Sequence, residues 1–205
     1  GVLFETDLRL RPDGAAGLMV CSVDAFRQYQ RQSAWVWEHQ ALTRARYCAG
    51  DAAAGARFEE TRREILRGSR DPEKLREEVL AMRQRMLEGH PNKSGLFDLK
   101  HDRGGMVDIE FIVQYLVLAN SHRHPVLTAN DGNIALLKLS ADLGLISRDL
   151  SDAVRNAYRD YRRRQHVLRL NGAQFARVPH EEVGAQIKAT RALWRAVFGT
   201  EPPES

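Results

Sequence analysis

The stretch that most constrains this chain is residues 97–118, which have the sequence FDLKHDRGGMVDIEFIVQYLVL. Its first four residues form a β-like run that ends at Lys100, and the pair Gly104 and Gly105 then opens a helix that is apolar on nearly every side. In a chain with 28% charged residues, a helix this hydrophobic must bury most of its surface. We therefore expect it to be the central helix of the fold.

Two carboxylates, Asp108 and Glu110, fall in the first turns of this helix. A carboxylate there can accept hydrogen bonds from free backbone N–H groups and can face the positive end of the helix dipole. The lysine and the two glycines at the same place also suit a phosphate or metal site, because glycines let a ligand approach the backbone closely. The residues alone leave both interpretations open.

The N-terminal residues alternate between apolar and charged side chains, which predicts a strand over residues 3–11. Glu5, Asp7, Arg9 and Arg11 share one face of this strand. A turn follows at residues 12–14, and residues 15–20 are a candidate for a second short strand. Because a lone hairpin is marginal in water, we expect residues 1–21 to be the edge of a sheet whose other strands come earlier in a longer protein.

The acidic face of the predicted strand has two interpretations. Strands that present carboxylates commonly hold Mg²⁺ for phosphoryl or nucleotidyl transfer, and neighbouring arginines would suit a metal-bound triphosphate. Alternatively, Glu5 and Asp7 pair with Arg9 and Arg11 on a solvated surface. Spacing alone favours the solvated surface.

From residue 22 onward the pattern is helical. Ser22 is a suitable N-cap, and Asp71 followed by Pro72 is a strong helix-start signal. Trp35 and Trp37 are expected to pack in the core or at an interface. Besides the central helix, we predict helices over residues 23–32, 34–47 and 51–67, from residue 71, and over 130–145, 150–170 and 182–198.

Residues 89–95 are the best linker candidate, since they contain two glycines and a proline. We therefore divide the chain into a sheet edge at residues 1–21, a helical connecting region at 22–89, a helical bundle domain at 90–199 and a frayed tail at 200–205. No internal repeat is visible.

Composition excludes several classes of protein. No run of 18 apolar residues exists, so no membrane span is expected. With 31 basic against 27 acidic residues, the positive excess is too small to make nucleic acid the leading partner. No export signal or zinc motif is present, and we expect a cytoplasmic protein in which Cys21 and Cys48 are reduced and at least half-buried.

Three segments resemble, in order, the signatures of one family. The run FETDLRLRPDG at residues 4–14, followed by Gly17 and Leu18, resembles the D-x-R-L-R-P-x-G-x-x-G segment of glutamine synthetase adenylyltransferase, the bifunctional adenylyl-transferring and adenylyl-removing enzyme. The run WEHQAL at 37–42, followed by RAR at 44–46, resembles the next signature, and residues 97–118 resemble a third. The matches extend from Asp7 to about Trp194.

This resemblance implies a mainly α fold, in which a helical bundle is preceded by the last strand or strands of a truncated polymerase-β-type nucleotidyltransferase sheet domain. The residues of the second and third segments are more similar to the C-terminal half of the family, which transfers AMP from ATP to a tyrosine of glutamine synthetase in nitrogen regulation. Related nucleotidyltransferases use three carboxylates, of which Asp7 resembles the third. The Gly-Ser and the acid pair of the earlier strands have no counterpart here, so we expect this chain to be inactive alone.

The resemblance also assigns roles. It implies ATP as substrate, Mg²⁺ as cofactor, and glutamine synthetase and the PII nitrogen-signal protein as partners. One departure is that the family's Asp-Asn occurs here as Asp131-Gly132-Asn133, so only the asparagine matches. The implied site comprises Asp7 as the catalytic and metal-binding carboxylate with Glu5 beside it, Arg9, Arg11, Lys100, Gly104 and Gly105 as nucleotide-binding residues, and Asp108 and Glu110 in support.

Three alternatives stay open at this point. The chain could come from the adenylyl-removing half of the family. It could be a non-catalytic helical interaction or regulatory module, which would have no need of the acidic face at Glu5 and Asp7. It could also be an RNA-binding helical domain that uses the arginine-rich residues 155–169, although Asp152 and Asp160 favour a solvated, internally paired face there.

Overall fold

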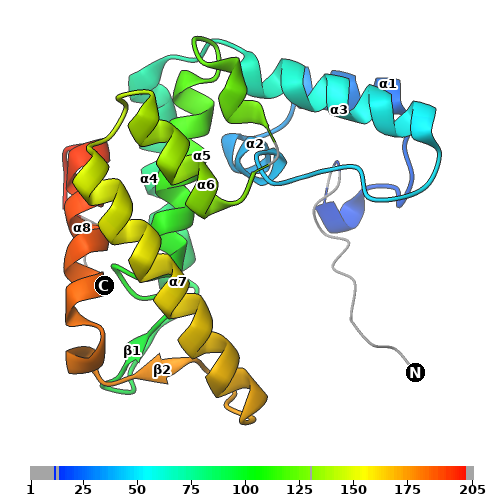
Figure 1. Ribbon diagram of the computed structural model, residues 1–205. Helices are drawn as coiled ribbons and strands as arrows, with labels where there is room; N and C mark the ends of the chain where they lie inside the picture. Colours follow the sequence, from blue (N-terminus) through cyan, green and yellow to red (C-terminus); the bar gives the residue numbers. More distant parts are fainter. Residues whose placement is uncertain (1–11, 13, 130, 202–205) are drawn as a thin grey trace.

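The computed structural model describes residues 12, 14–129 and 131–201, and it is mainly helical, as the sequence predicts. Figure 1 shows a body of helices with an arm of two further helices extending from one side. The predicted strand over residues 3–11, with Glu5, Asp7, Arg9 and Arg11, lies outside the described residues. The division of the chain into domains stays a prediction.

The second strand predicted at residues 15–20 is wrong. A 3-10 helix, η1 (Gly14–Ala16), occupies part of this segment, and residues 17–20 belong to no strand. Gly14 has a φ of +54°, and the Gly17 N–H donates to the Gly14 carbonyl at 3.2 Å. This tight turn uses local hydrogen bonds in place of the ladder that a strand would need.

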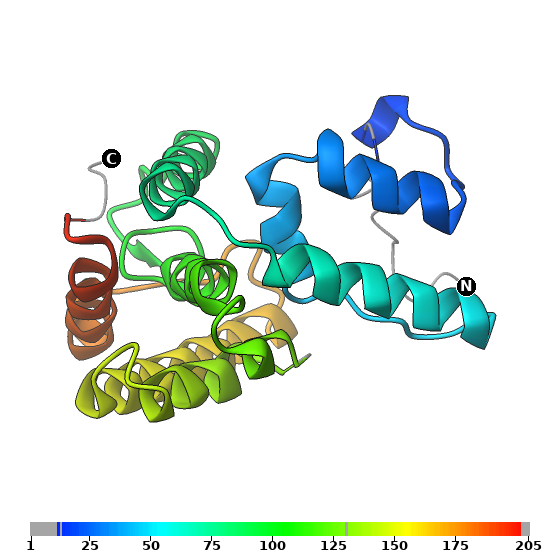
Figure 2. The ribbon, with the colours of Figure 1, turned by 90° about the horizontal axis from the view of Figure 1, so that it is seen from above.

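The arm consists of α1 (Val23–Gln32) and α3 (Ala52–Arg67), which lie side by side in Figures 1 and 2. Ser22 is the N-cap of α1, as predicted, and its hydroxyl accepts from the Ala25 N–H at 3.1 Å. Phe26 and Phe58 pack with their ring centroids 5.6 Å apart. Arg27 adds an ion pair across the two helices, to Glu60 at 2.9 Å.

Helix α2 (Val36–Leu42) joins the arm to the body and is shorter than the predicted 34–47. It ends at Leu42 because the buried Arg62 guanidinium takes over the carbonyls there, donating to Leu42 and Thr43, both at 2.8 Å. Trp35 is 68% exposed, so it does not pack in the core, and its packing at an interface stays a prediction. Trp35 is the N-cap residue of α2, and Trp37, in the first turn, is half-buried.

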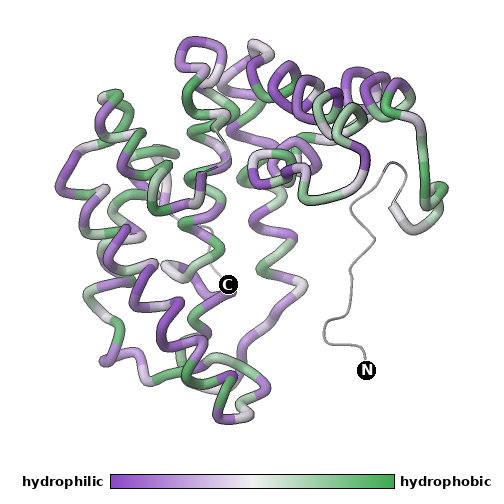
Figure 3. The backbone as a smooth tube through the Cα atoms, turned by 45° about the vertical axis from the view of Figure 1, so that its right-hand side comes forward, coloured by the Kyte–Doolittle hydropathy of each residue, from purple (hydrophilic) through white to green (hydrophobic). Residues whose placement is uncertain are grey.

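The body surrounds α5 (Met106–Asn120), which is buried along most of its length and is central, as predicted. Around it lie α4 (Pro72–Glu88), α6 (Asn133–Asp142), α7 (Arg148–Leu170) and α8 (Gly184–Phe198), together with the 3-10 helices η2 (Pro125–Thr128) and η3 (His180–Glu182). Asp71 caps α4 through the Lys74 N–H at 2.8 Å, as its sequence signal predicts. The outer helices alternate hydrophilic and hydrophobic stretches in Figure 3, as amphipathic helices do.

A two-stranded antiparallel sheet closes one end of the body. Strand β1 (Phe97–Asp98) confirms the start of the predicted β-like run, and it pairs with β2 (Arg177–Val178), which the sequence pattern did not predict. Phe97 lies opposite Val178, and both are buried. The pairing fixes the segment that leads into Lys100.

Two surface predictions have opposite outcomes. The arginine-rich face of α7 is internally paired, as expected, with Arg155 on Asp152 at 2.6 Å and Arg163 on Asp160 at 2.8 Å. By contrast, Cys21 and Cys48 are both exposed, so their predicted burial is wrong. Each lies in a connecting segment outside the helices, where no apolar surface covers it.

Candidate functional site

The glycine pair before α5 forms a tight turn that neighbouring protein atoms fill. Gly104 has a φ of +89°, and a Cβ there would lie 2.9 Å from Cγ2 of Ile187. At Gly105, a Cβ would lie 2.9 Å from the Leu99 carbonyl oxygen. Both positions therefore require glycine for packing. Their contact with a nucleotide stays a prediction.

The first N–H groups of α5 are also occupied by protein. Met106 donates to the Leu99 carbonyl at 2.9 Å, and Val107 donates to the Lys100 carbonyl at 3.1 Å. The Gly104 N–H donates to Oδ2 of Asp108 at 2.6 Å. The start of α5 thus satisfies its own donors, as the simpler interpretation of Asp108 expects.

Asp108 is buried and ion-paired. Its Oδ1 accepts from Nε of Arg83 on α4 at 2.6 Å, and Nη2 of Arg83 donates to the His101 carbonyl at 2.8 Å. Burial raises the pKa of Asp108, while the Arg83 guanidinium and the Gly104 N–H oppose this shift. The carboxylate is saturated by these contacts, which gives it a bracing role within the fold.

Lys100 is exposed at the end of the β1 segment. Its backbone N–H donates to the Asp98 carboxylate at 3.0 Å, and this contact orients the turn. Its ammonium group has no ion pair within the described part of the chain and is accessible to a ligand. Lys100, Gly104 and Asp108 are therefore brought to one turn by the fold.

Glu110 belongs to a different cluster, which joins α5, α6 and α7 to the turn after α2. Its Oε2 lies 3.2 Å from Nη1 of Arg44, two residues past the end of α2, and its Oε1 accepts from the Tyr158 hydroxyl on α7 at 3.1 Å. The same hydroxyl accepts from Nδ2 of Asn133 at the start of α6, at 2.9 Å. We call Arg44, Glu110, Asn133 and Tyr158 the Glu110 network.

The Glu110 network brings together residues from the second and third segments of the resemblance, and Asn133 from the departing segment. A buried hydrogen bond also joins the second and third segments: Nε2 of Gln40 on α2 donates to Oε1 of Gln114 on α5 at 2.9 Å. Tyr158 was missed by the sequence reasoning. The available signal was a tyrosine on the apolar side of an amphipathic helix, because a half-buried hydroxyl needs a partner.

One side of the network opens toward the N-terminal segment. A pocket of about 350 Å³ is lined by Arg44, Glu38, Phe26 and Pro12, among other residues. Pro12 follows Asp7 by five positions in the sequence. The pocket therefore brings Pro12 to Arg44 of the Glu110 network.

Comparison with known proteins gives a consistent result over nearly the whole chain. An enzyme of Aromatoleum aromaticum named bifunctional glutamine synthetase adenylyltransferase/adenylyl-removing enzyme is 57% identical over 98% of this chain, and enzymes of the same name from Nitrosomonas eutropha and Bordetella bronchiseptica are 53% and 58% identical over 98% and 97% of it. This chain belongs to their family. It spans about a fifth of their length, 21% to 23%.

Two family models divide the chain between them. The model described as Glutamate-ammonia ligase adenylyltransferase matches residues 1–61, and the model described as GlnD PII-uridylyltransferase matches residues 73–196. The second match covers more than half of the chain, so the chain also belongs to that family through its helical body. Both descriptions name nucleotidyl-transferring enzymes, and the second match covers α4 to α8.

Two further observations concern the described residues only. Within residues 12, 14–129 and 131–201, no group of three or more histidines, cysteines and acidic residues has a geometry suited to a metal ion. None of the helices in that part of the chain is both long and apolar enough to span a bilayer.

Proposed function

We propose that this chain is the helical part of a protein adenylyltransferase, which works with an adjoining nucleotidyltransferase domain to transfer AMP from ATP to a tyrosine of glutamine synthetase. The observation that carries the proposal is the Glu110 network, since it joins the segments that resemble the family's signatures and lies beside the segment after Asp7. The names of the relatives support the same activity.

The metal in this proposal belongs to the N-terminal strand. Asp108 is a poor ligand, because Arg83 and the Gly104 N–H already occupy its two oxygens. Asp7, with Glu5 beside it, would hold Mg²⁺ together with the acid pair of the adjoining domain. Mg²⁺ bound there would neutralise the phosphate charges of ATP during transfer. Asp7 would also accept the proton of the tyrosine hydroxyl.

The nucleotide-binding roles follow from charge and exposure. Lys100 presents an exposed ammonium group without an ion pair in the described residues, so it is available to the triphosphate. Arg9 and Arg11 would add charge on the strand that carries Asp7. Gly104 and Gly105 contribute by shaping the turn that carries Lys100.

The direction of chemistry and the partners are part of the proposal. The residues of the second and third segments support the adenylylating half. The PII signal protein would be a second partner of the complete enzyme. The alternative is the adenylyl-removing half, which the relatives' names also include. The Gly-Ser and the acid pair that precede the third carboxylate in related nucleotidyltransferases have no counterpart before Asp7 in this sequence, so the chain alone should be inactive. The complete enzyme would act in the cytoplasm.

The test is label transfer from α-labelled ATP to glutamine synthetase with Mg²⁺, in a longer protein that includes the adjoining nucleotidyltransferase domain. The parent should label, and Asp7→Asn should abolish labelling while the helical content is unchanged. Asp149→Asn, at an exposed position on α7, is the matched control. Labelling by Asp7→Asn would disprove the role of Asp7. A parent that removes AMP but does not add it would favour the adenylyl-removing half.

A further inference from the structure

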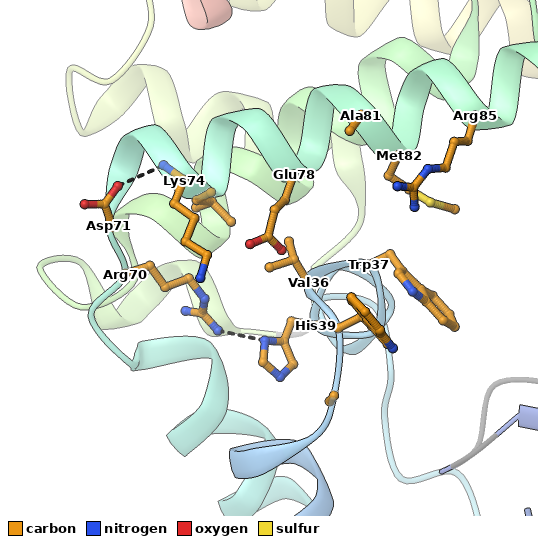
Figure 4. Close-up of a pocket in the computed structure, with 13 residues that line it drawn as sticks. Val36, Trp37, His39, Arg70, Asp71, Lys74, Glu78, Ala81, Met82 and Arg85 are labelled. Carbon is orange, nitrogen blue, oxygen red and sulfur yellow. Dashed lines mark hydrogen bonds between the residues drawn. The ribbon is translucent and has the colours of Figure 1, made fainter.

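A cavity of about 670 Å³ lies between α2 and α4. It shares no residue with the Glu110 network and includes none of the site residues predicted from the sequence. Figure 4 shows its side chains arranged in sequence along α4, with a cationic end, a carboxylate in the middle and an aromatic end.

The cationic end is formed by Arg70 and Lys74. The Arg70 guanidinium donates to the backbone carbonyls of Ile65, Leu66 and Gly68, at 2.8, 3.3 and 3.0 Å, and its Nη2 lies 3.4 Å from Nδ1 of His39. These contacts occupy both Nη atoms, but no carboxylate in the described chain pairs with the group, so Arg70 contributes its positive charge to this end of the cavity. The exposed Lys74 ammonium, which lies beside it in Figure 4, is free of ion pairs among the described residues and can donate to an anion.

Asp71 is the acidic residue at this end, but one of its carboxylate oxygens is engaged as the N-cap of α4. The half-buried Glu78, one turn after Lys74, occupies the middle of the cavity in Figure 4. It has no ion pair or hydrogen bond in the described part of the chain. A carboxylate in this position can accept two hydrogen bonds from vicinal hydroxyl groups.

The other end carries flat and apolar surface. Trp37 lies there with Met82 and Arg85 in Figure 4, and Trp35, 68% exposed, lines the same cavity. Aromatic faces stack on any nucleobase, and an arginine can add a cation–π contact or donate to ring nitrogens.

We propose that this cavity binds a nucleoside monophosphate, with the phosphate at Lys74 and Arg70, the ribose hydroxyls at Glu78 and the base between Trp35 and Trp37. The order of the three groups along α4 matches the order of phosphate, sugar and base in such a ligand. The cavity is also within the size range of pockets that hold molecules of this kind. This site is independent of the ATP site proposed at Asp7 and Lys100.

The experiment titrates AMP into this chain in the presence of EDTA, with tryptophan fluorescence and calorimetry as readouts. EDTA excludes binding that depends on a metal. We expect saturable quenching, because Trp35 and Trp37 would stack on the base. Lys74→Ala and Trp35→Ala should each weaken AMP binding about tenfold, since each removes a contact worth about 1.5 kcal/mol. Both side chains are exposed, so both variants should fold, and circular dichroism checks this.

The matched control is Lys93→Ala, at an exposed lysine outside the cavity, which should bind AMP like the parent. Weaker AMP binding by Lys100→Ala would overturn the inference, because it would place AMP at the proposed triphosphate position. Adenosine should bind at least about tenfold more weakly than AMP. The 2′,3′-dideoxy form of AMP should bind more weakly to the parent, and Glu78→Gln should reduce that difference.

Several results would overturn the inference. They are the absence of AMP binding at millimolar concentration, equal binding of AMP by Lys74→Ala and the parent, or binding of inorganic phosphate as tightly as AMP, which would indicate a simple anion site. Because this titration contains no metal and no glutamine synthetase, its failure leaves the label-transfer result unaffected, and the two proposals fail separately.

Discussion

Nε of Arg83 lies 2.6 Å from Oδ1 of Asp108, and each of these side chains is only 1% exposed. The pair joins α4 to α5 across the predicted linker at residues 89–95. Arg83 also donates to the His101 carbonyl, and Asp108 accepts from the Gly104 N–H, so one ion pair holds two helices and the turn between them. A buried pair of this kind is costly to break, because the remaining charge stays in a medium of low dielectric.

Replacing Asp108 should therefore destabilise the chain strongly. We expect Asp108→Asn to lower the free energy of unfolding by about 3 to 5 kcal/mol, because it leaves the Arg83 charge buried and uncompensated. Urea unfolding followed by circular dichroism measures this change. The exposed Asp149→Asn in the first turn of α7 should change the free energy by less than about 1 kcal/mol, since it removes only a favourable interaction with the helix dipole.

A double substitution distinguishes a structural role of Asp108 from a role in metal binding. Arg83→Met combined with Asp108→Leu should cost less than the sum of the two single changes, since no charge is then left unpaired. Additive losses, or recovery of Asp108→Asn stability by added Mg²⁺, would count against the structural interpretation.

Replacement by alanine should cost different amounts of stability at two glycines, Gly104 and Gly172, that both have left-handed backbone. Gly104 and Gly172 have φ values of +89° and +82°, but a Cβ at Gly172 would meet no atom within 4 Å, whereas one at Gly104 would lie 2.9 Å from Ile187. Gly172→Ala should cost about 1 to 2 kcal/mol for the left-handed backbone alone. Gly104→Ala should cost about 1 to 3 kcal/mol more, because it also overpacks the core. Thermal unfolding of the two variants compares these costs, and equal values would show that the α8 side chain gives way.

Local signals in the sequence predicted much of this fold. Ser22, Asp51 and Asp71 each stand before a helix and accept a hydrogen bond from the N–H three residues later, so these helix starts follow from short-range chemistry. The apolar run at residues 106–119 identified the central helix, because a helix that is apolar on nearly every side must be buried. By contrast, α2 ends where the distant Arg62 captures its carbonyls, and no local pattern at residues 34–47 contains that information.

The candidate site shows the same limit. Asp108 and Glu110 are two residues apart and were predicted to act together, but the helix turns them to different neighbours, Arg83 and Tyr158. Two positions on a helix differ by about 200° around its axis. The partner that each of the two side chains contacts therefore depends on how α4 and α7 pack against α5. Asp7 and the strand predicted around it lie outside the described residues, so this part of the site stays a prediction.

The turn between α4 and α5 should also make stability depend on pH. Burial, together with the nearby His90, whose ring stacks on it at 3.9 Å, and Lys100, lowers the pKa of His101 to about 4. The unfolded chain, with an ordinary histidine pKa near 6.5, then binds more protons than the folded chain at mildly acidic pH. The contribution of His101 is therefore complete above about pH 6.5 and is lost as the pH falls toward 4.

Urea unfolding of the parent and of His101→Gln, each at about pH 7 and about pH 5, measures this contribution. The parent should lose more stability between the two values than the variant does. His122→Gln, in an exposed loop, should behave like the parent. An equal loss in the parent and in His101→Gln would assign the pH dependence to other groups.

The Tyr158 hydroxyl is expected to support both stability and activity. It donates to Glu110 and accepts from Asn133, so Tyr158→Phe leaves two polar groups with one partner fewer. The cost should be about 1 kcal/mol, because Glu110 keeps its contact with Arg44. Tyr115→Phe is the matched control, since the Tyr115 ring packs on Phe198 and its hydroxyl makes no hydrogen bond within the described chain.

In the longer enzyme, Tyr158→Phe should lower kcat/KM for AMP transfer to glutamine synthetase several-fold more than Tyr115→Phe does. The reason is that Glu110, without the Tyr158 hydroxyl, keeps its contact with Arg44 but is less rigidly held, so that Arg44 is positioned less precisely at the pocket that Pro12 also lines. Label transfer at several ATP concentrations separates the effect on kcat from the effect on KM. If both variants transfer AMP like the parent while Tyr158→Phe is less stable, the Glu110 network only holds the helices together, and the observation that carries the proposed function is lost.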